Sequence, residues 1–361
     1  MSKYSPATIN SYYQCSPNSV IELSDGKATL STLKYFGTTI SIDIFNTPNE
    51  QSKNILCKAL NVIQEYHYLA SNYSTYPHVT NIKSINNEPS KKHPIDPKLT
   101  ELISESIRWH DISHGYFNIA LSPVIDLWRQ HRFACMRNAK DCSIPDSQAL
   151  TQAAKHTDIS QIQLNIEDNE IQLAKGMSID LGGIAKGWMA EKVYQQLKHD
   201  GVSQFMINAG GNIRHYGLHP QGRLFTTAIE DPICKKHDFQ LPKCNGFDGQ
   251  YHEVIQGEDL TIVSSGNYLR YFEVDGKQYH HLIDPHTLAP KPTGVATTVI
   301  MNDNQIMADV LSTMLFLMPV DEALDYVERH DGIEAVWYLD EQGHKKASKH
   351  FKRYSVLEHN E

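Results

Sequence analysis

Apolar and polar residues alternate along several short segments of the chain, and this pattern predicts β-strands. The clearest case is 38–45 (TTISIDIF). A hairpin is predicted where 271–274 and 278–283 flank Asp275-Gly276, because both residues of an Asp-Gly pair tolerate a positive φ. Further strands are predicted at 202–209, 260–264, 297–301 and 335–339.

Segments with helical spacing of apolar residues separate these strands. In 188–197, Met189, Val193 and Leu197 recur every four residues, which predicts one buried helical face. Other helices are predicted at 51–68, 99–112 and 308–318. Because strands and helices are mixed throughout without a repeat, we predict a mixed α/β (α+β) fold.

The polar segments predict how the chain is organised around this fold. Residues 1–25 are polar and turn-rich, and we predict that 1–30 form an N-terminal extension. The main domain is predicted at 31–345, followed by a polar C-terminal tail at 346–361. The polar segment 132–145, which holds two cysteines, is predicted to be an excursion, and 232–249, which is rich in Lys, Pro, Gly and Cys, is predicted to be a surface insertion.

Composition narrows the function classes. The net charge of −9 argues against general nucleic-acid binding, which requires a basic surface. The six cysteines include no C-x-x-C pair, and a chain of 361 residues can build a core without cross-links, so reduced thiols are expected. Neither a membrane span nor a signal-peptide core is visible. We therefore predict a cytoplasmic protein, unless a leader upstream of Met1 was removed.

The segment 180–187 (DLGGIAKG) carries the strongest sign of chemistry. An apolar, strand-like lead-in precedes it and the helix at 188–197 follows. Gly182 and Gly183 let a ligand approach the backbone, and a helix start with Lys186 favours phosphate. The spacing matches neither the Rossmann nor the P-loop signature. A plain strand–helix turn with a solvent-facing lysine fits the same spacing.

Two further groups of residues are candidates for catalysis. Asp309 and Thr313 are four residues apart, so their oxygens share one helical face and suit Mg²⁺. Helix capping by Asp309 is the alternative. His281 is a candidate general base near neutral pH, although a structural histidine is the commoner case. A zinc site on His280 and His281 ranks lower, because adjacent strand residues point to opposite faces.

Several short motifs occur along the chain in one order. They are Phe36-Gly-Thr-Thr39, Ser74-Thr-Tyr76, Ser113-x-Gly-x-Phe117, Pro123 to Trp128, Asp180 to Gly187, Asn208-Ala-Gly-Gly211, Ser265-Gly266, His281-Leu-Ile-Asp-Pro285 and Ala308-Asp309 to Thr313. Each motif is unspecific, but the ordered set is specific. Over 36–336 the chain resembles the FAD:protein FMN transferases of the ApbE family.

The resemblance implies a fold with a larger and a smaller domain, two interleaved subdomains within 31–345, and FAD in the cleft between them. It also implies Mg²⁺-dependent transfer of FMN from FAD to a Ser or Thr hydroxyl of an acceptor flavoprotein, with release of AMP. The acceptors of such enzymes often carry an Asp-x-x-Ser/Thr-Gly-Ala-Ser/Thr motif. An Mg²⁺-dependent FAD pyrophosphatase and a non-catalytic FAD-binding protein are the alternatives.

The resemblance also assigns residues to roles. His281 corresponds to the base that takes the proton of the acceptor hydroxyl. The residues implied in holding Mg²⁺ are Gly183, Asp309 and Thr313. Those implied in binding FAD are Phe36, Tyr76, Phe117, Asn118, Asp180, Lys186 and Ile283.

The chain departs from the family pattern at four positions. Phe36 stands where Met is usual, Asn118 where Asp is common, Asn267 where Asp or Ser is frequent, and Leu288 where Gly is usual. Because the implied base and metal residues are intact, an active enzyme is expected. Leu288 is expected to reshape the loop beside His281 and so to alter acceptor choice.

Overall fold

A computed structural model describes residues 9–16, 19–245, 247–302 and 305–356 of the chain. A ten-stranded antiparallel sheet forms its centre, in the order β1-β2-β3-β4-β8-β9-β12-β17-β18-β19. These strands are β1 (Ile9–Tyr13), β2 (Ser19–Ser24), β3 (Lys27–Thr32), β4 (Ile40–Phe45), β8 (Phe205–Ala209), β9 (Asn212–Tyr216), β12 (Thr261–Gly266), β17 (Ala296–Met301), β18 (Ile333–Tyr338) and β19 (Lys345–Ala347).

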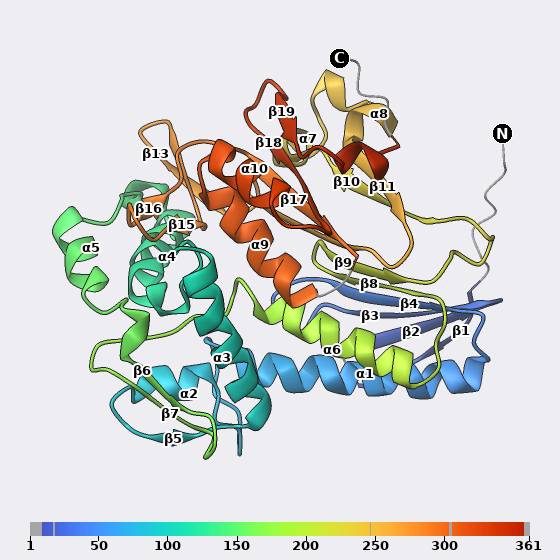
Figure 1. The fold of residues 1–361 in the computed structure, drawn as a ribbon, viewed down its shortest axis with the longest axis horizontal. Helices are drawn as coiled ribbons and strands as arrows, with labels where there is room; N and C mark the ends of the chain where they lie inside the picture. Colours follow the sequence, from blue (N-terminus) through green and yellow to red (C-terminus); the bar gives the residue numbers. More distant parts are fainter. Residues whose placement is uncertain (1–8, 17–18, 246, 303–304, 357–361) are drawn as a thin grey trace.

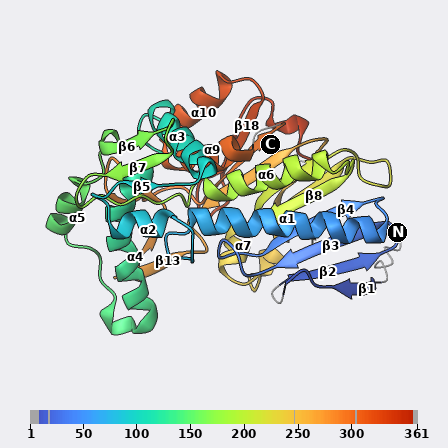
Figure 2. The ribbon, with the colours of Figure 1, turned by 90° about the horizontal axis from the view of Figure 1, so that it is seen from below.

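Helices of the described chain pack on this sheet (α1, α6, α9 and α10) or lie beside it. They are α1 (Asn49–Ala70), α2 (Ile82–Asn87), α3 (Pro97–Ile112), α4 (Ser122–Arg137), α5 (Ser147–Ala154), α6 (Ala185–His199), α7 (Pro232–Lys236), α8 (Phe247–Gln250), α9 (Gln305–Leu317) and α10 (Val320–Glu328). Helices α1 and α6 lie side by side along one face, and α9 packs against α6 (Figures 1 and 2). Met189, Val193 and Leu197 of α6 are fully buried there, which confirms the predicted apolar face.

Four small sheets lie outside the main one. They are β10 (Phe225–Glu230) with β11 (Tyr251–Gly257), β13 (Tyr271–Val274) with β14 (Lys277–His280), β15 (Ile283–Asp284) with β16 (Ala289–Pro290), and β5 (His93–Pro94) with β7 (Glu170–Leu173) and β6 (Ile162–Asn165). The predicted hairpin is confirmed as β13–β14, with φ values of 51° at Asp275 and 75° at Gly276. In Figure 1, α4, α5, β13, β15 and β16 gather at the end far from β1–β4.

The two ends of the chain contribute more structure than their polar sequences predict. In the described part of the polar, turn-rich segment 1–25, β1 and β2 pair with each other and β2 pairs with β3. Ile21 and Leu23 of β2 are buried in the core. Near the other end, Phe351 is buried beside Ile255 and Ile262. The alternating Ile21 and Leu23 are too few to stand out as a strand in a polar context.

The apolar lead-in to the glycine loop is not a sheet strand. β7 ends at Leu173, and Met177–Ile179 have no strand partner. The backbone N–H and C=O of Ile179 instead bond the side-chain amide of Asn86, at 2.9 and 2.8 Å. The predicted strand is therefore wrong, because one asparagine side chain satisfies the backbone groups that a neighbouring strand would satisfy. The predicted turn followed by a helix is confirmed.

The expectation of reduced thiols is wrong, because all six cysteines form disulfides. Cys15 is joined to Cys57 of α1 with Cα atoms 5.5 Å apart. The other pairs are Cys135–Cys142 and Cys234–Cys244. The segment 132–145 is also not wholly irregular, since α4 continues to Arg137. Sequence spacing does not reveal these pairs, because the fold brings each pair together from different elements or turns.

Candidate active site

The first turn of α6 meets the middle of α9 at one buried carboxylate. Asp309 of α9 is only 3% exposed. Its Oδ2 accepts a hydrogen bond from the Gly187 backbone N–H at 2.9 Å, and its Oδ1 lies 3.3 Å from Lys186 Nζ. Asp309 lies inside α9, so it does not cap its own helix. It satisfies an N–H at the start of α6, where no side chain provides the N-cap bond.

Gly183 and Thr313 lie beside this carboxylate. A Cβ atom added at Gly183 would lie 3.9 Å from Thr313 Oγ1 and 3.1 Å from Cε2 of Phe117. A larger residue at Gly183 would therefore have to displace the Phe117 ring by a few tenths of an ångström. Thr313 Oγ1 is 3.3 Å from Ser265 Oγ at the end of β12. The Gly183 backbone thus lies near the Thr313 hydroxyl, one helical turn from the Asp309 carboxylate, and a backbone carbonyl, a hydroxyl and a carboxylate are donor types that suit Mg²⁺.

Asp180 is held by protein partners on both of its carboxylate oxygens. Oδ1 accepts from the Gly182 N–H at 2.8 Å, and Oδ2 is 2.7 Å from Arg129 Nη2 of α4. Asn72 donates to the same Oδ2 at 3.3 Å. Sequence reasoning missed Arg129, which also pairs with Asp126. Burial lowers the pKa of Arg129, but the carboxylates of Asp180 and Asp126 outweigh burial, so the pKa of its guanidinium is raised. Asp180 therefore fixes the shape of the glycine loop.

Aromatic side chains form a cluster around the C-terminal end of α1. The Tyr68 and Tyr76 rings stack with centroids 4.0 Å apart. His67 donates to or accepts from Tyr76 Oη at 3.2 Å, and its Nδ1 accepts from the Phe36 N–H at 3.2 Å. Burial, with a smaller contribution from Lys34, lowers the pKa of His67 and keeps its ring neutral. The structure thus brings Phe36 and Tyr76 together through His67, a residue that the sequence did not single out.

His280 and His281 differ sharply in their surroundings. Both ring nitrogens of His280 are bonded, Nε2 to the Lys291 carbonyl at 2.8 Å and Nδ1 to the Leu282 N–H at 3.2 Å. His281 Nδ1 is buried and has no hydrogen-bond partner among the described residues. No cluster of three or more His, Cys, Asp or Glu side chains suited to a metal occurs in the described ranges. Nothing therefore supports a zinc site at His280.

The pKa of His281 is lowered from 6.5 to about 3. Desolvation by burial is the main cause. Positive charge from Arg270, Arg132 and Lys186 adds to it, as does His280 when it is protonated. The imidazole is therefore neutral at physiological pH and surrounded by cationic groups.

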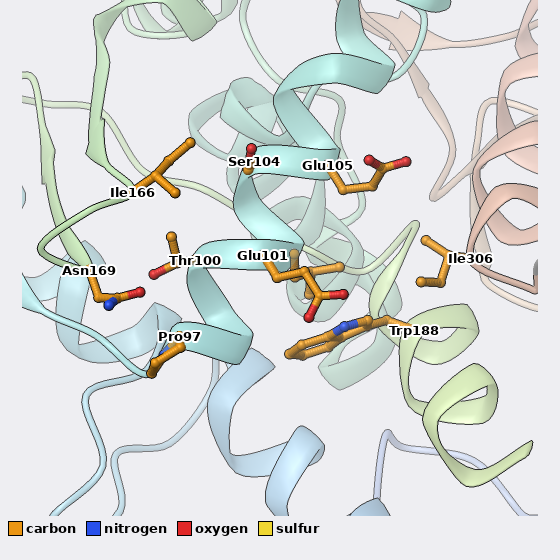
Figure 3. A pocket seen from close by; sticks show the side chains of 10 residues that line it. Pro97, Thr100, Glu101, Ser104, Glu105, Ile166, Asn169, Trp188 and Ile306 are labelled. Carbon is orange, nitrogen blue, oxygen red and sulfur yellow. The ribbon is translucent and has the colours of Figure 1, made fainter. Parts of the chain in front are cut away.

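Two sizeable cavities of the described chain are lined by other residues than Asp309 and His281. One of about 520 Å³ lies along α3 and is lined by Glu101, Glu105 and Trp188, among others (Figure 3). Its glutamates already have partners, since Glu101 pairs with Lys192 and Glu105 with Arg108. A second, of about 480 Å³, borders Asn72 and Arg129, which are the partners of Asp180. The groups that gather around Asp309 line neither cavity.

Comparison with known proteins identifies the family. A family model described as the ApbE family matches residues 36–337. The chain belongs to the ApbE family.

Curated relatives agree with this assignment. The FAD:protein FMN transferase of Vibrio cholerae serotype O1 is 26% identical over 322 residues, which cover 88% of this chain and 90% of the relative. That of Treponema pallidum is 28% identical over 278 residues, covering 73% and 72%. A crystal structure of the ApbE protein of Thermotoga maritima has a TM-score of 0.75 at 24% identity and covers 96% of this chain and all of that chain. This confirms the mixed α/β fold of the family.

Two departures from the ApbE pattern stabilise loops. Asn118 accepts from the Ala120 N–H at 2.8 Å, which caps the short helix η1 (Ile119–Leu121), and donates to the Thr157 carbonyl at 3.0 Å. Asn267 donates to the Gly294 carbonyl at 2.8 Å. Both side chains are thus bonded to protein backbone in this structure.

The other two departures occupy positions that favour glycine. Phe36 and Leu288 have φ values of 56° and 59°, in the left-handed region. Leu288 therefore keeps a glycine-like backbone, and its carbonyl accepts from the Trp128 indole N–H at 2.8 Å. Its side chain packs against the apolar cluster that contains Ile283, which is 4% exposed. This argues against a reshaped turn, because the extra atoms of leucine are accommodated by packing.

Proposed function

We propose that this chain transfers FMN from FAD to a Ser or Thr hydroxyl of an acceptor flavoprotein and releases AMP. The curated relatives carry the name FAD:protein FMN transferase. One contact supports the proposal most directly. The first turn of α6, with Lys186, meets Asp309 of α9, and Gly183 and Thr313 lie next to it. This arrangement brings positive charge, free backbone and hard oxygens to one place, which suits a metal-bound diphosphate.

The reaction exchanges one phosphorus–oxygen bond for another. The acceptor oxygen attacks the phosphorus on the FMN side of the diphosphate. The bond from that phosphorus to the bridging oxygen breaks, and the bridging oxygen leaves with AMP. The hydroxyl proton passes to His281, whose Nδ1 has no partner among the described residues. Lys186 balances the negative charge that develops on the phosphate oxygens.

The donor set around Asp309 fits Mg²⁺. Gly183 would supply a carbonyl, Asp309 a carboxylate and Thr313 a hydroxyl. When bound, Mg²⁺ neutralises diphosphate charge and stabilises the charge that develops during transfer. The ammonium of Lys186 lies against Asp309 in this structure, so cationic charge is already accommodated next to that carboxylate.

The low pKa of His281 couples its function as a base to FAD binding. With a pKa of about 3 the imidazole is neutral but accepts protons poorly. The permanent charges among the other causes, Arg270, Arg132 and Lys186, are all positive, and a bound diphosphate offsets them. FAD binding therefore raises the pKa of His281 toward the range in which a general base is effective. The base becomes competent only when the flavin donor is in place.

The remaining predicted residues hold FAD in different ways. Phe36 and Tyr76 offer aromatic surface to the flavin or the adenine, whereas Phe117 and Ile283, which are 5% and 4% exposed, would act by packing behind the site. Asp180 acts through the loop that it shapes, because both its oxygens are already bonded. Asn118 acts in the same way through η1.

Two alternatives share this site. Water in place of the acceptor hydroxyl would give an Mg²⁺-dependent FAD pyrophosphatase that releases FMN and AMP. A non-catalytic FAD-binding protein would need neither a base nor a metal. The unpartnered Nδ1 of His281 and the oxygens beside Asp309 favour catalysis over simple binding.

The test is to incubate the protein with FAD, Mg²⁺ and a carrier protein bearing the Asp-x-x-Ser/Thr-Gly-Ala-Ser/Thr motif. Mass spectrometry follows the carrier, and chromatography follows AMP and FMN. We expect the carrier to gain the mass of FMN minus water in wild type and in His199→Ala, a control at the end of α6. His281→Ala should bind FAD and form no adduct. AMP with free FMN and no adduct would indicate the pyrophosphatase, and intact bound FAD would indicate the binding protein.

The disulfides also bear on location. The sequence predicts a cytoplasmic location because no signal-peptide core is visible, and it separately predicts reduced thiols, whereas all six cysteines are paired. Disulfides persist mainly in oxidising compartments, so we propose that the protein acts in one. Alkylation and mass spectrometry of the protein from its native cells should find no free thiol before reduction. If all the cysteines are alkylated before reduction, the thiols are free, and this result would favour the cytoplasmic location instead. In the described ranges, no helix has the length and apolar character needed to cross a bilayer.

A further inference from the structure

Two arginines, Arg132 and Arg270, which the function above uses only as charges near His281, lie at the same end of the β13–β14 hairpin as His281. Tyr271 pairs with His280 across the hairpin. Arg270 and His281 therefore occupy the next register position, one residue beyond that pair. In an antiparallel ladder such positions are close neighbours.

The other arginine comes from α4, which packs on the same hairpin. Trp128 of α4 stacks on Tyr279 of β14 with ring centroids 5.5 Å apart. Arg132 is four residues after Trp128, so it lies on the same helical face one turn further along. Its electrostatic neighbours are Arg270 and Arg129, and it acts on His281 as Arg270 does. The two arginines thus approach the candidate base from two different elements.

Neither Arg132 nor Arg270 has a hydrogen bond or an ion pair with any residue in the part of the chain that the structure describes. Arg132 Nε is buried and unpartnered, as is His281 Nδ1. Arg129, one turn earlier on the same helix, shows the contrast because it pairs with Asp126 and Asp180. Two guanidinium groups placed together without an anion repel each other, and this arrangement is expected where an external anion binds.

We propose that Arg132 and Arg270, the arginine pair, bind a carboxylate of the acceptor protein next to the hydroxyl that is flavinylated. The inference rests on the proposed function and assigns how its second substrate is recognised. The arginine pair is a positioning and specificity device, and it takes no part in proton transfer.

The position of the pair favours the acceptor over FAD as the source of the anion. In the proposed function the diphosphate of FAD binds to Lys186 of α6 and near the oxygens around Asp309 of α9. Arg270 is exposed and lies on the side of His281 formed by α4 and the hairpin, so a protein surface can reach it. The chain carries a net charge of −9, which repels acidic partners in general. A local positive site beside the base therefore selects an acidic acceptor segment and sets its register.

The experiment compares two carriers and three enzymes. One carrier bears the Asp-x-x-Ser/Thr-Gly-Ala-Ser/Thr motif, and the other has Asn in place of its Asp. The enzymes are wild type, the double variant Arg132→Gln/Arg270→Gln, and the control Arg137→Gln. Arg137 is an exposed arginine at the end of the same helix and is not among the charges that act on His281. The single variant Arg270→Gln, at an exposed position, replaces the double variant if the latter fails to fold.

Three quantities are measured: KM for the carrier, kcat, and the Kd for FAD from flavin fluorescence. With the Asp carrier, the double variant should raise KM by about 10- to 50-fold and leave the Kd for FAD within about twofold. With the Asn carrier, wild type and double variant should show the same high KM, because the charge pair is absent in both cases. Arg137→Gln should match wild type.

Two outcomes would overturn the inference while leaving the proposed function intact. A weakened Kd for FAD with an unchanged KM for the carrier would assign the arginine pair to a phosphate of FAD. Unchanged KM and Kd would show that it binds neither substrate. A wild-type enzyme that binds FAD but leaves the Asp carrier unmodified would contradict the proposed function itself, and the inference would fall with it.

Discussion

Replacing Asp309 by asparagine separates the structural role of this carboxylate from the metal-binding role that we propose for it. Asp309 is 3% exposed, accepts the Gly187 N–H at 2.9 Å and faces Lys186 Nζ at 3.3 Å. Asparagine keeps the shape and still accepts from Gly187, but it removes the negative charge. The variant therefore retains the contact with α6 and loses both the ion pair and the charged metal ligand.

The expected magnitudes follow from these contacts. A hydrogen bond to a charged acceptor contributes about 1 kcal/mol more than one to a neutral acceptor. Lys186 is partly exposed, so the loss of its ion partner costs at most about 1 kcal/mol. The free energy of unfolding should fall by about 1 to 2 kcal/mol. The lost metal ligand removes several kcal/mol of transition-state stabilisation, so flavin transfer should fall by about 100-fold or more.

Urea unfolding without Mg²⁺ measures the first effect, and flavin transfer as a function of Mg²⁺ concentration measures the second. Asp325→Asn on α10, where the aspartate pairs with Arg329 at 3.5 Å on the surface, is the control and should change neither. Circular dichroism confirms that Asp309→Asn is folded at the assay temperature. Wild-type transfer with a wild-type Mg²⁺ requirement would refute the reasoning and leave Asp309 as a structural acceptor for α6.

Three further predictions concern stability and the turn at Leu288. Burial, then Arg214, lowers the pKa of His215 from 6.5 to about 4, so the unfolded chain binds more protons between these values. The free energy of unfolding should therefore fall by about 3 kcal/mol as pH drops from 6.5 to 4. In urea unfolding, the His215→Gln variant should not show this part of the pH dependence. The Cys15–Cys57 disulfide joins residues that are 42 apart in the sequence, so a Cys15→Ala/Cys57→Ala variant should lose about 4 kcal/mol of unfolding free energy. An unchanged urea midpoint would argue against this disulfide. Leu288→Gly should leave the acceptor profile by mass spectrometry unchanged, because φ is already 59°; a shifted profile would restore the reshaped-loop hypothesis.

Local patterns in the sequence were enough to predict the elements that carry the site. The four-residue spacing of Met189, Val193 and Leu197 predicts α6 and its buried face, since one helical face must be apolar to pack. The Asp275-Gly276 pair predicts the β13–β14 hairpin, since both residues adopt a positive φ. Both patterns involve residues close together in the sequence, so they can be recognised without knowing which other elements pack against them.

The candidate site itself was predicted only in part. The ordered motifs identified Gly183, Lys186 and Asp309, and the structure places Lys186 against Asp309 and Gly183 near Thr313, one turn further along the same helix. The interpretation of Asp309 as a cap of its own helix does not hold, because the N–H that it accepts belongs to Gly187 of another helix. Motif spacing describes neighbours along the chain, and it cannot show which distant backbone group a side chain reaches.

Tertiary structure alone decided the long-range pairings. Arg129 meets Asp180 across 51 residues, and Cys15 meets Cys57 across 42. Arg270 reaches the level of His281 only because the hairpin pairs Tyr271 with His280. Each of these residues has an ordinary local context. The pairing of charges and thiols depends on the distance between their atoms, and that distance is set by the packing of helices on the sheet, which no local pattern encodes.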